Sequence, residues 1–152
     1  MFEDDDELDD DFSEEDDGES DLDKHREMPV FKKAMHIGEL TRAITDTFEE
    51  EKDVFKLRSQ MLEMAYILGA KIAGAEAADV YSIRMENAML IKINARELHA
   101  CATLALDEEL SEAAYLEALK KEIDDFRGLF IEWVKSFDKT NDIEDDWDIL
   151  NL

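Results

Sequence analysis

The chain has few of the residues that interrupt helices or cross-link a fold. Its 152 residues include one proline, one cysteine and five glycines. With only Cys101, no intramolecular disulfide can form, which is typical of a reducing compartment. No apolar run approaches the roughly 20 residues that span a bilayer, and the acidic amino terminus lacks the basic start of a secretory signal. We therefore expect a soluble, cytoplasmic protein that does not enter a membrane.

Basic residues are also scarce. The chain has 17 Lys and Arg against 42 Asp and Glu, a net charge of −25. This charge argues against nucleic acid and anionic lipid as direct ligands, because both bind basic surfaces. A basic surface on another protein is the expected partner.

The acidic residues concentrate at the two ends of the chain. Residues 1–28 hold sixteen acids against Lys24 and Arg26, a net charge of −14, and residues 138–152 hold six acids against Lys139, a net charge of −5. Residues 29–137 keep the remaining −6. We therefore divide the chain into an acidic tail (1–28), one folded domain (29–137) and a second acidic tail (138–152).

The two tails differ in their apolar content. Low hydropathy and high charge predict that residues 1–28 are disordered, either as a solvating tail or as a docking segment with isolated apolar anchors. Pro29 marks the end of this tail, because proline fits the first turn of a helix. The acidic-aromatic tail 138–152 carries Trp147, Ile149 and Leu150 beside Asp145 and Asp146. Such apolar side chains are expected to pack on the folded domain or in a partner's groove.

From Val30 onward, apolar residues recur at spacings of three and four, which predicts helices and no strand. The expected helices cover about 30–48, a stretch beginning near Asp53, 79–105 and 108–137, with Asp79 as the N-cap of the third. Together they predict an all-α, antiparallel four-helix bundle. Its last helix is expected to bury a largely aromatic seam made of Tyr115, Leu119, Ile123, Phe126, Phe130, Trp133 and Phe137.

A charged residue interrupts the apolar sector of the third helix. Arg84 falls in the middle of this sector and Asn87 at its edge when the helix is laid out at 100° per residue. A buried guanidinium needs a carboxylate partner. Since the acids nearest in sequence are Glu76, Asp79 and Glu86, we predict a buried polar network of these five residues.

Metal and nucleophile signatures are weak. The chain lacks the Glu-x-x-His spacing of di-iron bundles, phosphate-binding glycine loops and zinc spacings. Glu76-Ala77-Ala78-Asp79-Val80, however, resembles the Glu-x-x-Asp segment of the MazG-like all-α nucleotide pyrophosphohydrolases. The resemblance implies Mg²⁺ at Glu76 and Asp79, with Glu50 and Asp53 as the upstream pair. Metal-bound carboxylates of this kind activate a water against a phosphate chain.

Longer stretches resemble an uncharacterised family of small acidic all-helical proteins from bacteria. They are residues 73–79, 84–88 and 129–138. This resemblance implies a helical fold and no particular activity.

Two functions follow from these patterns. The first is a non-enzymatic interaction or regulatory protein without a cofactor, which docks through its acidic tails on a basic surface of a larger cytoplasmic assembly. The alternative is a Mg²⁺-dependent nucleotide pyrophosphohydrolase of the all-α type. Met85 and Met89, outside the main apolar sector of the third helix, indicate a homo-oligomer contact or a partner groove.

Overall fold

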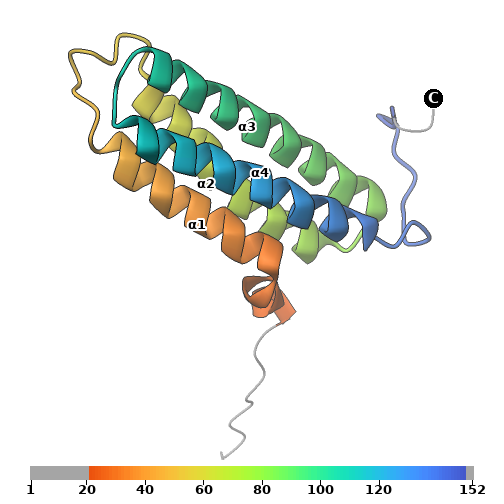
Figure 1. The fold of residues 1–152 in the computed structure, drawn as a ribbon. Helices are drawn as coiled ribbons and strands as arrows, with labels where there is room; N and C mark the ends of the chain where they lie inside the picture. The colour runs from red at the N-terminus through yellow and green to blue at the C-terminus, as the bar shows by residue number, and fades with distance from the viewer. Residues whose placement is uncertain (1–20, 150–152) are drawn as a thin grey trace, which may run out of the picture.

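The computed structural model of the chain describes residues 21–149. It contains a 3₁₀ helix and four long helices: η1 (Asp21–Glu27), α1 (Pro29–Thr45), α2 (Leu57–Ala78), α3 (Tyr81–Asp107) and α4 (Ala113–Lys135). No strand occurs in this part of the chain. Figure 1 shows the long helices side by side, with the α1–α2 and α3–α4 connections at one end and the α2–α3 turn at the other. The predicted antiparallel four-helix bundle is confirmed.

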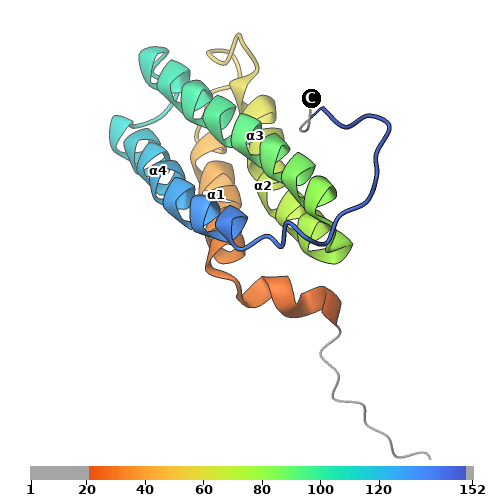
Figure 2. The same cartoon turned by 90° about the vertical axis from the view of Figure 1, so that its right-hand side faces the viewer.

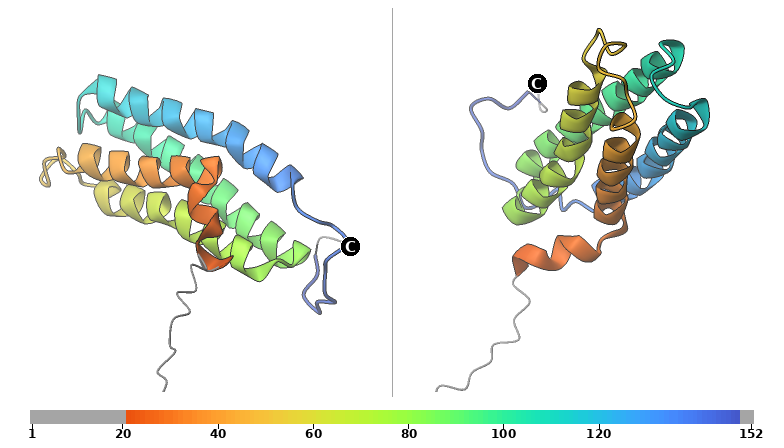
Figure 3. Two further views of the ribbon diagram at one scale, coloured as in Figure 1. Left: turned by 90° about the horizontal axis from the view of Figure 1, so that it is seen from below. Right: turned by 90° about the vertical axis from the view of Figure 1, so that its left-hand side faces the viewer.

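The helices pack in a ring in chain order. Helix α1 contacts α2 and α4, and α3 contacts the same two helices. Figures 2 and 3 show this arrangement from the sides and from below. Between residues 21 and 149, no helix has the length and apolar content needed to cross a membrane.

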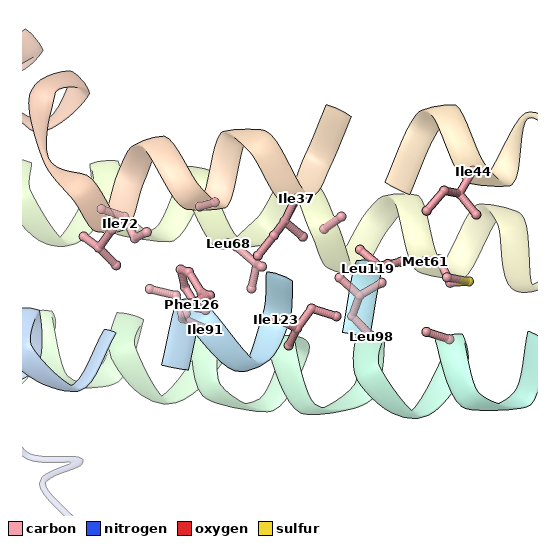
Figure 4. Packing of buried hydrophobic residues seen from close by; sticks show 14 of the residues in the cluster. Ile37, Ile44, Met61, Leu68, Ile72, Ile91, Leu98, Leu119, Ile123 and Phe126 are labelled. Atoms are coloured by element: carbon pink, nitrogen blue, oxygen red, sulfur yellow. The ribbon is translucent and has the colours of Figure 1, made fainter. Parts of the chain in front are cut away.

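The apolar stripes of all four helices meet along the axis of the bundle. The most enclosed side chains, each at most 1% exposed, include Ile37 from α1, Leu68 from α2, Ile91 from α3 and Phe126 from α4. Figure 4 shows these residues facing one another across the bundle. Each helix contributes one apolar face to this core. Burial of these faces against one another therefore holds the four helices together.

The buried face of α4 differs by one position from the expected one. Tyr115 is 47% exposed, whereas Leu116 is fully buried. Leu116 fits the spacing of three and four that Leu119 and Ile123 continue, and it brings the face into register from the first turn. The assignment of Tyr115 to the core was wrong, while the rest of the seam is buried or, at Phe130, partly buried.

The helix ends also differ from the predictions. Helix α1 ends at Thr45 and not near residue 48, and residues 46–56 form the connection to α2. Asp53 does not begin α2 but caps it: its carboxylate accepts hydrogen bonds from the backbone N–H of Leu57 at 2.7 Å and of Arg58 at 3.0 Å. Asp53 is 6% exposed, so these amides replace the water that its charge would otherwise bind.

The end of the predicted amino-terminal tail is folded. Residues 21–27, which the sequence assigned to the tail, form η1, which packs on α1 and α2. The ring of His25 lies edge-on to Phe31 with 4.7 Å between the ring centroids. Pro29 occupies the start of α1 as predicted. The disorder predicted for the preceding part of the tail concerns residues outside those described.

Whether Leu116 or Tyr115 belongs to the core of the bundle can be tested by substitution. Leu116→Ala removes a fully buried side chain, and we expect it to lower the free energy of unfolding by about 2–5 kcal/mol. Tyr115→Ala is the matched control on the neighbouring, half-exposed position and is expected to cost about 1 kcal/mol or less. Urea denaturation of both variants measures the difference. A larger loss for Tyr115→Ala would show that the expected register was correct.

Candidate functional site

Arg84 joins three helices at the end of the bundle that holds the α2–α3 turn. Its side chain is 12% exposed, and Nη2 donates a hydrogen bond to Oε1 of Glu76, in the last turn of α2, at 2.5 Å. Trp133 of α4 donates from Nε1 to the same carboxylate oxygen at 2.7 Å. The guanidinium carbon lies 4.2 Å from the ring centroid of Phe137, in cation–π contact. We call these four residues the Arg84 cluster.

The structure unites only part of the predicted polar network. Asp79 approaches the cluster, with Oδ1 3.6 Å from Nη1 of Arg84, but its side chain is 78% exposed. Glu86 is exposed and lies outside the cluster. Asn87 donates to the carbonyl of Ile83, one turn earlier, at 2.9 Å. The prediction was therefore wrong for Glu86 and Asn87 as partners of Arg84, because both side chains point along their own helix or into solvent.

The carboxyl-terminal tail caps α3. The predicted N-cap, Asp79, instead ends α2 in the left-handed conformation with φ 46°, and Val80 at the N-cap position of α3 makes no side-chain cap. The amide of Tyr81 donates to the carbonyl of Asn141 at 2.8 Å, and the amide of Ser82 donates to Oδ1 of Asp142 at 3.1 Å. These two anchor residues, Asn141 and Asp142, thus bind amides that lack partners within the helix.

Further hydrogen bonds fix the part of the tail between α4 and the anchor residues. The side-chain amide of Asn141 also donates to the carbonyl of Asp79. Just after α4, Thr140 donates from its backbone and its hydroxyl to Oδ1 of Asp138, at 2.9 and 2.7 Å. These hydrogen bonds hold the pKa of the Asp138 carboxyl below its ordinary value. The tail is consequently attached to the bundle through residue 142.

The charge of Asp142 suits the end of a helix. The amino terminus of a helix carries partial positive charge, which favours a carboxylate. Hydrogen bonding by Ser82, through its side chain and its backbone, and by the amide of Ile143 holds the pKa of the Asp142 carboxyl below its ordinary value of 3.8.

Beyond the anchor residues, the tail exposes its apolar side chains. We call residues 143–149 the projecting segment. Ile143, Trp147 and Ile149 are 57%, 87% and 73% exposed. The backbone amide of Trp147 donates to Oδ1 of Asp145 at 3.0 Å, which forms a local turn, and Asp146 is exposed. Leu150, the last predicted partner-binding residue, lies outside the described residues.

The two acidic pairs of the hydrolase hypothesis lie at opposite ends of α2. Glu76 and Asp79 are at its carboxyl end, engaged by Arg84, whereas Glu50 and Asp53 precede its amino end. A helix of 22 residues separates the pairs by about 30 Å. Among residues 21–149, no group of three or more His, Cys, Asp and Glu side chains is placed to hold a metal ion.

Four residues of this region were not predicted as site residues. Trp133 and Phe137 were assigned only to the core, although their spacing of four already placed them on one face of the predicted last helix (108–137). Asn141 and Asp142 are residue types that cap helices, but nothing in the sequence indicated that they would cap a helix some sixty residues earlier.

The chain matches none of the protein-family models, and no curated protein matches it. Both resemblances noted in the sequence therefore stay predictions.

Glu76 is the acceptor on which the Arg84 cluster depends. Glu76→Ala would leave the guanidinium without its carboxylate and Trp133 without an acceptor, and we expect a loss of about 2–3 kcal/mol in the free energy of unfolding. The control Glu86→Ala removes an exposed acid that is two residues from Arg84 in sequence but outside the cluster, and it is expected to change stability by about 0.5 kcal/mol or less. Chemical denaturation measures both free energies of unfolding. Equal losses for Glu76→Ala and Glu86→Ala would contradict a specific role of Glu76 as the partner of Arg84.

The lowered pKa of Asp142 predicts an acid-sensitive cap. Its contribution is complete above the ordinary carboxyl pKa of 3.8 and is lost as the pH falls through the lower folded value. We expect hydrogen-exchange protection of the Ser82 amide to fall in this acidic range. Asp142→Asn should lower the protection already at neutral pH, and the control Asp146→Asn should leave it unchanged. If protection of the Ser82 amide changes neither with pH nor with Asp142→Asn, Asp142 does not cap α3.

Proposed function

We propose that this protein is a non-enzymatic interaction protein that docks through its acidic tails on a basic surface of a larger cytoplasmic assembly. The observation that carries this proposal is the exposure of Trp147, which at 87% is the most exposed of the large apolar side chains described. An aromatic side chain left in water loses favourable burial free energy, and a partner's pocket would restore it.

The surroundings of Trp147 support the same function. Ile143 and Ile149 are exposed on the same segment, and Glu144, Asp145 and Asp146 supply negative charge between them. Apolar anchors give a docking segment its affinity, while flanking charges steer it to a basic surface and fix its register. The anchor residues hold the base of the segment against α3, which reduces the conformational entropy lost on binding.

The geometry of the acidic pairs favours this function over the Mg²⁺-dependent hydrolase. Glu76 already accepts hydrogen bonds from Arg84 and Trp133, and Asp53 accepts them from two backbone amides. A metal at either pair would have to displace these donors.

Affinity capture with the full chain tests the proposal. A tagged wild type is compared with a Trp147→Ser/Ile149→Ser variant at low ionic strength, in a lysate of the cells in which the protein naturally occurs. We expect the variant to lose the captured proteins, and we expect high salt to release them from the wild type, because exposed charges are screened. Val54→Ser, which replaces a side chain 68% exposed in the α1–α2 connection, is the control and should retain them.

An identical set of captured proteins for the wild type and the Trp147→Ser/Ile149→Ser variant would refute docking through the tail. A rise in melting temperature with Mg²⁺ or Mn²⁺ that Glu76→Gln abolishes would instead support the hydrolase, because a ligand bound only to the folded state stabilises it.

A further inference from the structure

A groove of about 600 Å³ lies between α3 and α4. Its walls are largely apolar: Ile123 is buried, Phe130 is partly buried, and Ile131 is 45% exposed. This α3–α4 groove is separate from the Arg84 cluster, which lies at the end of the bundle, and it is large enough to receive an aromatic side chain.

The rim of the groove is basic, unlike the chain as a whole. Lys92, Arg96 and Arg127 line it. Asp124 is the one carboxylate among the described residues that line it, and it lies 3.8 Å from His99. With His99 neutral, the lining has a net charge of +2, in a chain of net charge −25.

These three bases have no partner among the described residues. Within residues 21–149, none of Lys92, Arg96 and Arg127 forms an ion pair or a side-chain hydrogen bond, whereas Lys33 of α1 and Lys121 of α4 pair with Glu122 and Asp125; Lys120 of α4 is also unpaired, but it does not line the groove. Unpaired cations around an apolar groove favour an acidic ligand that carries an apolar anchor.

The projecting segment has this chemistry. Trp147 supplies the apolar anchor, and Glu144 and Asp146 supply exposed carboxylates on either side of the turn at Asp145. We infer that the α3–α4 groove binds the projecting segment, residues 143–149, of a second copy of this chain. The inference rests on the proposed function, in that it takes the projecting segment to be a docking element and names one of its partners.

In the structure, the projecting segment lies away from the groove of its own chain. The anchor residues attach its base to Tyr81 and Ser82, which begin α3, at the end of that helix opposite to the α3–α4 connection. Figure 2 and the right-hand view of Figure 3 show this part of the tail on the side of the bundle away from α4.

Each of two copies has both a projecting segment and an α3–α4 groove, so each can bind the other. If each copy inserts its projecting segment into the groove of the other, the exchange closes as a symmetric dimer. Trp147 is then buried in the dimer and is withdrawn from other partners. Self-association would thus compete with docking on the larger assembly.

Sedimentation velocity of the full chain over a range of concentrations tests the inference. We expect a monomer–dimer equilibrium that high salt weakens. Trp147→Ser should weaken dimerisation by about 30-fold or more, as for the loss of a buried aromatic anchor, and Arg96→Glu/Arg127→Glu should also prevent it. Met89→Ser, which alters an exposed side chain of α3 that does not line the groove, is the control and should leave the dimer intact.

Mixing the two defective variants gives a stricter test. The Trp147→Ser chain keeps a functional groove, and the Arg96→Glu/Arg127→Glu chain keeps a functional projecting segment. We expect the mixture to form heterodimers that neither variant forms with itself, because one of the two contacts is restored.

Carbodiimide cross-linking identifies the occupant, since it joins a carboxylate to a nearby lysine. In a mixture of isotope-labelled and unlabelled wild type, we expect Lys92 to be joined to Glu144 or Asp146 of a different copy. A link from Lys92 to residues 1–20, or to the projecting segment of the same copy, would overturn the inference in favour of that occupant.

The inference also fails if the wild type is monomeric at all concentrations, or if Arg96→Glu/Arg127→Glu dimerises normally. These failures differ from failure of the proposed function. A monomer that still captures other proteins through Trp147 keeps the proposed function and loses only the self-contact, whereas a dimer that captures nothing keeps the self-contact alone.

Discussion

A guanidinium inside a helical bundle needs a carboxylate, and at Arg84 this need organises one whole end of the molecule. Glu76 from α2 supplies the charge, and Trp133 from α4 donates to the same oxygen. Phe137 covers the guanidinium with its ring, and the chain that follows it reaches the α2–α3 turn. The tail that follows binds the free amides of α3, so the cap of one helix depends on the packing of another.

Charged residues are distributed unevenly over the molecule. Half of the bases in the folded domain form ion pairs with acids, as in the pairs Lys33–Glu122 and Arg58–Asp46. Most of the excess negative charge belongs to residues 1–28 and 138–152 and not to the folded domain. The unpaired bases Lys92, Arg96 and Arg127 gather around the α3–α4 groove, and they give a strongly acidic chain a surface to which an acidic segment can bind.

Periodicity predicted the fold because the core needs only repeated apolar burial, and every helix carries that pattern. It failed at Tyr115, where two neighbouring positions both fit a seam with spacings of three and four, and only contact with α1 and α3 selects Leu116. Asp79 failed as an N-cap because a capping residue type does not specify which end of which helix it will cap. Glu86 is closer to Arg84 in sequence than Asp79 is, but its side chain leaves the helix on the exposed side.

The sequence by itself determined the helical class, the concentration of charge in two tails, and the presence of a buried arginine that needs an acid, because these depend on composition and local spacing. The tertiary structure decided which acid that is, how α3 is capped, and which bases remain unpaired around a groove. Each of those outcomes depends on side chains from helices far apart in the chain, whose distances are set by packing and not by sequence separation.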